Sequence, residues 1–211
     1  MIEDIIPFVV STEMDDYLKL TIPRNRYLFK NFVLVTKPTD EKTIDLCNKH
    51  FIDIVYFNDF YKNASFNKSG AIHAAQKILH EKYKHKWLLL HDSDIIFPED
   101  LKEKINNVHP RNKEALYGID RYNVMNMEDL QNEVKNNPYV YAGEYSCFIG
   151  SFQLYYNKNF FYPIFSRTAG TCDVQFLQNF KIKQKIPNSH VFHIGKRGMH
   201  WNGRRKQNFW V

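Results

Sequence analysis

An uncharged apolar run, Trp87 to Leu90, is followed almost at once by two aspartates, Asp92 and Asp94, and Pro98 closes the segment. A run of this kind is typical of a strand buried on both faces, as in the parallel sheet of an α/β domain. In an extended chain, residues two apart point to the same side. Both carboxylates are therefore expected to face one point beyond the carboxyl end of the strand, where open α/β sheets bind their ligands.

The Asp-x-Asp pattern is informative mainly through this position, because a chain with 13 aspartates in 211 residues contains about one such pair by chance. Two neighbouring carboxylates ionise more readily with a cation between them. Oxygen ligands and phosphate partners suit Mg²⁺ or Mn²⁺ better than zinc. The intervening Ser93 offers a hydroxyl and a backbone N–H to a ribose or a phosphate. The segment therefore predicts a metal–phosphate site.

Strand and helix patterns alternate through the first half of the chain. The expected strands are Ile5–Val10, Phe32–Val35, Ile52–Phe57 and Trp87–Leu90. The expected helices are Tyr17–Phe29, interrupted by Pro23, then Asp40–Phe51, capped by Asp40, and Ser69–Tyr83. The residues expected to face the core are Ile44, Cys47 and Phe51 in the second helix, and Ile72, Ala75, Ile78 and Leu79 in the third. The alternation indicates βαβ units with right-handed crossovers and a parallel sheet.

The second half of the chain has a different pattern. Strands are expected at Ala115–Ile119, Ser146–Tyr156 and Val191–Ile194, a short helix at Cys172–Phe180, and a polar, mobile connection over residues 123–138. We expect a single α/β domain over residues 1–211, with a nucleotide-binding half at 1–97 and an acceptor half at 98–211. The apolar end, Phe209 to Val211, favours an N-terminal domain cut from a longer polypeptide.

Composition and motifs exclude several classes of protein. The sequence has no apolar run near the roughly 18 residues of a membrane span. It begins with Met-Ile-Glu-Asp, so acidic residues stand where a signal peptide needs basic ones. Its three cysteines have neither metal-ligand spacing nor the even number of a disulfide framework. These features predict a cytoplasmic protein. The lack of GxGxxG, Walker A and GxSxG motifs counts against dinucleotide oxidoreductases, P-loop proteins and α/β-hydrolases.

The net charge of +6 is concentrated at the carboxyl end. From Val174 to Val211 there are eight Lys or Arg residues and no Asp or Glu, so the remainder carries 21 basic and 23 acidic residues, a balance of −2. A basic tail is compatible with nucleic-acid binding, with a clamp on a diphosphate beside a metal site, or with a solvated surface. Charge alone leaves these three interpretations open.

Three further segments carry candidate residues. The basic tail contains His190, His193 and His200, and His193 lies nearest the end of its strand. As a metal ligand, the imidazole of His193 would favour Mn²⁺. A structural role for His193 is equally compatible with the sequence. Asp173 follows a glycine loop at a helix start, where it is either a cap or a general base. Lys68 stands at the entry to a helix, where an anion can bind.

The chain resembles the GT-A class of nucleotide-sugar glycosyltransferases. The likeness lies in the strand order, the strand end His91–Asp94 and the tail from His193 to Arg204, and it covers nearly the whole chain. It is especially similar to the compact GT-A domains encoded by large algal DNA viruses, which work in the host cytoplasm. The resemblance implies a single GT-A (Rossmann-like) α/β domain with a mixed, mostly parallel sheet flanked by helices.

The resemblance also implies a role for each candidate residue. Asp92, Asp94 and His193 would hold Mn²⁺ or Mg²⁺. The UDP-sugar would be contacted by Thr12 at its uridine, by Lys68 and Arg205 at its diphosphate, and by Ser93. Asp173 matches the position of the base in inverting members, although Cys172 stands where a second acid is usual. Gln153, Trp201 and His200 would face the sugar and the acceptor.

By the same resemblance, the protein would transfer a hexose or deoxyhexose from a UDP-sugar to a hydroxyl of a glycan or glycoprotein acceptor, in viral glycan synthesis and without nucleic acid. In an inverting reaction Asp173 would take the acceptor proton, whereas in a retaining one Gln153 or the donor phosphate would be nearer the reaction. One alternative is a metal-dependent nuclease or phosphoesterase, which would be expected to gather more carboxylates. A non-catalytic nucleic-acid or glycan binder would not need Asp92 and Asp94. No oligomeric state is indicated.

Overall fold

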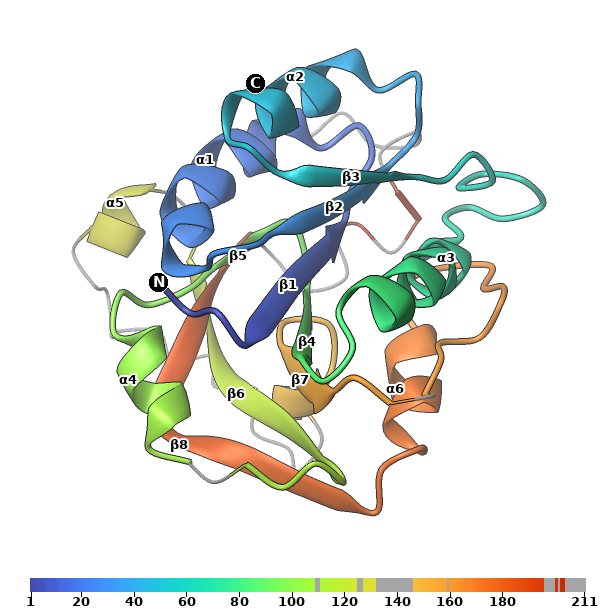
Figure 1. The fold of residues 1–211 in the computed structure, drawn as a ribbon. Helices are drawn as coiled ribbons and strands as arrows, with labels where there is room; N and C mark the ends of the chain where they lie inside the picture. Colours follow the sequence, from blue (N-terminus) through green and yellow to red (C-terminus); the bar gives the residue numbers. More distant parts are fainter. Residues whose placement is uncertain are drawn as a thin grey trace.

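The computed structural model in Figure 1 describes residues 1–108, 111–124, 127–131, 146–158, 160–195, 200 and 202–203. Its strands are β1 (Ile5–Val10), β2 (Val33–Thr36), β3 (Asp53–Tyr56), β4 (Trp87–His91), β5 (Ile95–Ile96), β6 (Ala115–Val124), β7 (Gln153–Tyr156) and β8 (Ile182–Ile194). Its α-helices are α1 (Asp15–Asn25), α2 (Glu41–Lys49), α3 (Lys68–Lys82), α4 (Leu101–Asn106), α5 (Met127–Gln131) and α6 (Cys172–Leu177), with 3₁₀ turns η1 (Arg26–Leu28) and η2 (Ser146–Phe148). None of these helices combines the length and apolar character that a membrane crossing requires.

The described strands form one mixed sheet in the order β3-β2-β1-β4-β7-β6-β8-β5. The first four run parallel, as βαβ units require, and β6 and β8 are also parallel to each other. The remaining neighbours, β4 with β7, β7 with β6, and β8 with β5, are antiparallel. The predicted fold class, an α/β domain with a mixed, mostly parallel sheet, is confirmed.

Helices cover both faces of this sheet (Figure 1). Apolar residues of α1, α2 and α4 pack on one face in what we call the first core, and those of α3 and α6 pack on the other face in the second core. The run Trp87–Leu90 is buried on both sides as predicted, since Leu89 joins the first core while Leu88 and Leu90 join the second. Complete burial of each leucine contributes about 1.5–3 kcal/mol, so β4 is held firmly where it presents its carboxyl end.

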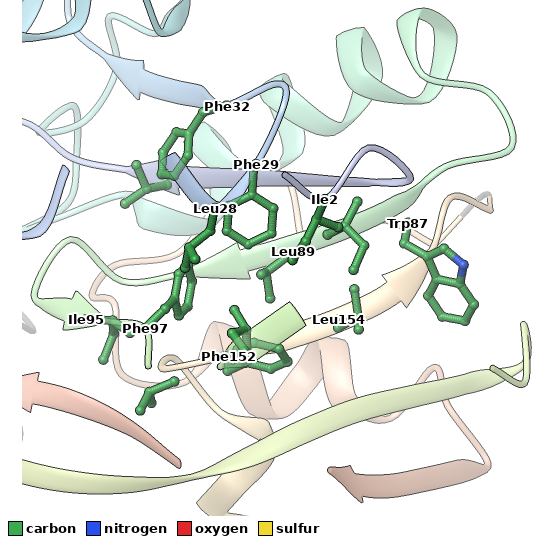
Figure 2. Packing of buried hydrophobic residues seen from close by; sticks show 14 of the residues in the cluster. Ile2, Leu28, Phe29, Phe32, Trp87, Leu89, Ile95, Phe97, Phe152 and Leu154 are labelled. Atoms are coloured by element: carbon green, nitrogen blue, oxygen red, sulfur yellow. The ribbon is translucent and has the colours of Figure 1, made fainter. Parts of the chain in front are cut away.

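Figure 2 shows the aromatic part of the first core, which supports the turn after β4. Phe97 follows β5, and its ring contacts Phe29 edge-on with centroids 5.8 Å apart and Phe152 with centroids 6.1 Å apart. Phe29 follows η1 and Phe152 immediately precedes β7, so three separate segments meet here. This packing holds the short segment β5 beside the end of β4.

Two predicted core positions are wrong. Helix α2 begins after the predicted cap Asp40, whose carboxylate accepts a hydrogen bond from Thr43 N, but Phe51 is 84% exposed. The reason is that Phe51 lies beyond the end of α2 with a φ of 53°, and so leaves the helical stripe. In α3, Ile78 is 48% exposed, because it is rotated by roughly 100° from Leu79 and the buried stripe includes the polar Gln76 in its place.

The elements of the second half differ most from the predictions. The strand predicted at 146–156 is wrong at its start, where η2 and an irregular segment precede β7. Strands β6 and β8 extend well beyond the predicted Ala115–Ile119 and Val191–Ile194, because they pair with each other along most of their length. Part of the predicted mobile connection is therefore ordered, as the end of β6 and as α5, and the rest lies outside the described residues. In the first half, α1 runs through Pro23 and ends earlier than predicted.

A buried asparagine joins α1 to the segment after the aspartates, and its loss should be measurable. Asn25 is 1% exposed; its Nδ2 donates to Ile95 O (2.8 Å), and its Oδ1 accepts from Phe97 N (2.9 Å). We expect Asn25→Ala to destabilise the protein by about 2–4 kcal/mol in urea unfolding, because two buried backbone groups lose their partners. The exposed Asn48→Ala in α2 is the control, and equal effects of the two substitutions would contradict this role.

Candidate active site

The two aspartates lie on a turn at the carboxyl end of β4. Because the strand ends at His91, the alternation of an extended chain does not orient Asp92 and Asp94; separate partners do. Asp92 faces Lys68 at the start of α3, and Asp94 faces His193 near the end of β8. The two carboxylates are nevertheless close enough for the charge of Asp94 to act on Asp92.

Lys68 links Asp92 to Asp173. Its Nζ lies 2.6 Å from Asp92 Oδ1 and 3.5 Å from Asp173 Oδ2, and its side chain is only 7% exposed. Burial by itself would lower the pKa of Lys68, but the charges of Asp173 and Asp92 outweigh it and raise that pKa above its usual value. Lys68 is therefore a permanent buried cation between one predicted metal ligand and the predicted base. The sequence reasoning assigned it to a diphosphate and did not foresee this bridge.

A glycine allows the backbone to pass against both carboxylates. Gly150 has a φ of 68°, and a Cβ atom there would lie 2.7 Å from Asp92 Oδ2 and 3.4 Å from Asp173 Oδ2. Any side chain at this position would fill the space that the two carboxylates share. Burial, with the charges of Asp94 and Asp173, raises the pKa of Asp92 to about 6 against the opposing effect of Lys68. Sequence reasoning missed Gly150, because it lies within the segment predicted to be a strand at Ser146–Tyr156.

Asp94 and His193 form the second pair, with His193 Nε2 3.3 Å from Asp94 Oδ2. Antiparallel pairing of β5 with β8 positions them, since Ile95 is opposite His193 and Ile194 N donates to Asp94 O (2.9 Å). Burial opposes ionisation of Asp94, but His193, His200 and Arg121 outweigh it and lower the pKa of Asp94 to about 2. Asp94 Oδ1 and His193 Nδ1 are buried and have no hydrogen-bond partner within the described residues.

Asp173 lies in the first turn of α6, where the cap position belongs to Thr171, so the capping interpretation is wrong. The Tyr162 hydroxyl is 2.8 Å from Asp173 Oδ1 and also contacts Gln153 Oε1. Gln153 is completely buried, and its Nε2 donates to Phe148 O (2.7 Å). Among the described contacts, Tyr162 is the residue that links Gln153 to Asp173. No local pattern in the sequence identified Tyr162.

The other predicted residues lie around these two pairs. Thr12 follows β1, whose parallel pairing with β4 puts it at the same edge as Asp92; its hydroxyl is buried and without a partner among the described residues. Ser93 is buried with its hydroxyl 3.0 Å from Met14 Sδ. The ring of His200 contacts Tyr17 edge-on, with centroids 5.1 Å apart. Trp201 and Arg205 lie outside the described residues.

The donor set partly fits a divalent metal. Two carboxylates and an imidazole are ligands that Mn²⁺ accepts. The buried Oδ1 of Asp94, which has no partner among the described residues, is an oxygen that a cation would satisfy. Within the described residues, however, no three His, Cys, Asp or Glu side chains are grouped closely enough to hold a metal as they stand. Asp92 is paired with Lys68, whereas Asp94 lies beside His193, so Asp94 and His193 are the better placed ligands.

The segments before α3 and α6 line an open pocket of about 610 Å³. Its lining includes Tyr61 and Asn63 from the segment before α3, Arg167 and Thr168 from the loop before α6, and Asn202. The two loops are joined by a hydrogen bond from Ser65 N to Arg167 O (2.9 Å). The same two segments continue into α3, which begins with Lys68, and into α6, which carries Asp173, but neither side chain is part of the pocket lining. Pockets of this size hold small organic molecules.

Comparison with solved structures identifies the fold. The structure of S. aureus TarS (residues 1–349, in complex with UDP-GlcNAc) matches 95% of this chain, with a TM-score of 0.63 and 11% sequence identity. The mannosyltransferase PcManGT from Pyrobaculum calidifontis, in complex with GDP-Man and Mn²⁺, matches 92% of this chain, with a TM-score of 0.58 and 12% sequence identity. A mycobacterial protein matches 91% of this chain over 67% of its own length, with a TM-score of 0.58 and 10% sequence identity. No known family profile and no curated protein sequence matches. The fold is thus of the GT-A type, and the chain spans about three fifths of TarS 1–349 (61%) and of PcManGT (58%).

Proposed function

We propose that the protein is a metal-dependent glycosyltransferase that moves a hexose or deoxyhexose from a UDP-sugar to a hydroxyl of a glycan acceptor. The observation that carries the proposal is the bridge formed by Lys68, which brings Asp92 from the end of β4 and Asp173 from α6 to one cation. This arrangement joins an acidic donor site to a carboxylate that can serve as a base. The UDP-GlcNAc of TarS supports a UDP-sugar as donor, and the GDP-Man and Mn²⁺ of PcManGT support a nucleotide-sugar donor with a divalent metal.

The reaction requires a base on the acceptor side and positive charge on the donor side. Asp173, with a side chain 11% exposed, would take the proton of the acceptor hydroxyl while the hydroxyl oxygen attacks the anomeric carbon and UDP departs, which inverts that carbon. The Lys68 ammonium would stabilise negative charge developing beside it. Asp94, His193 and Asp92 would hold the metal, which would supply further positive charge to the diphosphate. Thr12 would contact the uridine, and Arg205 the diphosphate.

The alternatives receive less support. A two-metal nuclease would be expected to gather more carboxylates than the described site, in which Lys68 already bridges Asp92 and Asp173. A simple binding module would need neither the buried cation Lys68 nor a carboxylate oxygen of Asp94 that lacks a partner in the described part of the chain. A role in viral glycan synthesis in the host cytoplasm stays a prediction from the sequence resemblance.

Calorimetric titration of UDP with and without Mn²⁺ tests this function. We expect UDP binding that depends on the metal, and Asp94→Asn should weaken it by a factor of about ten or more, a loss of about 1.4 kcal/mol, because a ligand of the metal is removed. Asp45→Asn, the same change on the exposed surface of α2, is the matched control. Binding that is indifferent to Mn²⁺ and to Asp94→Asn would overturn the proposal and direct attention to nucleic-acid substrates.

A further inference from the structure

The Tyr162 hydroxyl has one proton but contacts two acceptor oxygens, Asp173 Oδ1 at 2.8 Å and Gln153 Oε1. The amide of Gln153 is oriented by the hydrogen bond from its Nε2 to Phe148 O (2.7 Å), so its oxygen faces Tyr162. All three side chains are inaccessible or nearly so. Burial, reinforced by the charge of Asp173, raises the pKa of Tyr162 well above its usual value, so the hydroxyl keeps its proton at neutral pH.

The Tyr162 ring cannot swing away from these partners. Its face stacks on Phe176 of α6, with centroids 4.3 Å apart and an interplanar angle of 20°. Its backbone N–H donates to Gln76 Oε1 of α3 (2.8 Å). Phe176 lies one turn after Asp173 on the same helix, so the stacking and the hydroxyl contact reinforce each other. The hydroxyl is thus held against the carboxylate of Asp173.

One proton cannot serve two acceptors at once, and this couples the network to the protonation of Asp173. When Asp173 is ionised, the hydroxyl donates to it, because a carboxylate is a stronger acceptor than an amide. When Asp173 carries a proton, the acid can donate to the Tyr162 oxygen, and the hydroxyl can donate to Gln153 instead. Each state then leaves the buried groups better satisfied than they would be without Tyr162.

We infer that Tyr162 is the positioning residue of Asp173 in both of its protonation states, with Gln153 as the second acceptor that acts only through Tyr162. The inference rests on the proposed function. In the transfer step, the O–H bond of the acceptor breaks and its proton passes to Asp173. The oxygen forms the bond to the anomeric carbon, and the electron pair of the broken carbon–oxygen bond leaves with UDP. Tyr162 and Gln153 exchange no atoms with the substrates; they hold the base while its charge changes.

Release of UDP from UDP-glucose, UDP-galactose and UDP-GlcNAc, with water as acceptor, tests this role. Tyr162→Phe should lower kcat about tenfold and leave the KM of the donor unchanged, because a hydrogen bond to a charged group is lost while no donor contact is touched. Gln153→Met should lower kcat in the wild type but have no further effect in Tyr162→Phe. The matched control is Tyr117→Phe, which removes another buried hydroxyl, bonded to Asn112 N in the first core, and should leave kcat unchanged.

Wild-type kcat in Tyr162→Phe, an effect confined to KM, or additive effects of Gln153→Met and Tyr162→Phe would overturn the inference. Thermal unfolding of Tyr162→Phe, Asp173→Asn and the double variant tests the contact between Tyr162 and Asp173 by stability alone, with no need for enzymatic activity. Non-additive stabilities are expected from the hydrogen bond, and additive ones would overturn the inference. If the wild type releases no UDP from the three donors, the proposed function loses support, and this cycle still decides whether Tyr162 holds Asp173.

Discussion

Replacing Asp173 by asparagine is expected to lower kcat for UDP-sugar turnover by about 10²–10⁴-fold, the usual contribution of a general base. The substitution keeps the size and shape of the side chain but removes the site that accepts the proton. Asp173 does not face the Asp94–His193 pair, so metal-dependent UDP binding should change little. Steady-state UDP release gives kcat, and calorimetry gives the affinity for UDP. A combined loss of binding and turnover would instead indicate that Asp173 acts on the donor.

The stereochemistry of the product provides an independent test of the same role. An enzyme that uses Asp173 as its base gives a product of inverted anomeric configuration, which NMR of the released sugar can follow before it mutarotates. Asp45→Asn serves again as the control for the substitution itself, because Asp45 is exposed on α2. Retained configuration together with near wild-type kcat in Asp173→Asn would show that Asp173 is not the base.

Replacing Lys68 by methionine is expected to destabilise the protein by about 3–5 kcal/mol. Methionine fills a similar volume but leaves Asp92 and Asp173 without the cation between them, and breaking a buried ion pair by removing one partner has this order of cost. The Lys68 side chain is only 7% exposed, so water cannot replace it readily. Urea unfolding measures the change in the free energy of unfolding.

The same helix offers a matched control for this prediction. Lys82 also pairs with an aspartate, Asp53, at 2.6 Å, but both side chains are 54% exposed. Lys82→Met should therefore cost less than about 1 kcal/mol, as exposed ion pairs do. Mn²⁺ should restore part of the stability lost in Lys68→Met, since the released carboxylates gain a new counter-cation. Equal losses in Lys68→Met and Lys82→Met would contradict the role of Lys68 as a buried bridge.

Much of the fold follows from local patterns in the chain. The uncharged run at Trp87–Leu90 predicted a strand buried on both faces, and β4 is buried along its whole length between two cores. The cap at Asp40 and the alternation of strands and helices up to β4 were also predicted correctly. The errors concern residues whose environment depends on distant partners, such as Ile78, or on a helix end, such as Phe51.

The candidate site could be predicted residue by residue but not as an arrangement. Asp92 and Asp94 were predicted from their place after an apolar strand, and Asp173 and His193 from short motifs. Their partners were not predictable in the same way. Lys68 is 24 residues from Asp92, and Tyr162 is 11 residues from Asp173, with no periodic pattern to connect them. Gly150 lies in a segment predicted to be a strand, so its role beside the carboxylates was not foreseen.

The order of amino acids alone therefore specifies an α/β sheet and an acidic turn at the end of its central strand, because burial periodicity and chain direction are local properties. Which carboxylate meets a cation, a histidine or a tyrosine depends on how α3, α6 and β8 pack around that turn (Figure 1). Those contacts form between segments far apart in the chain, where only three-dimensional packing brings the charges together. Electrostatic interaction in this buried site then determines which groups are ionised and which are held in place.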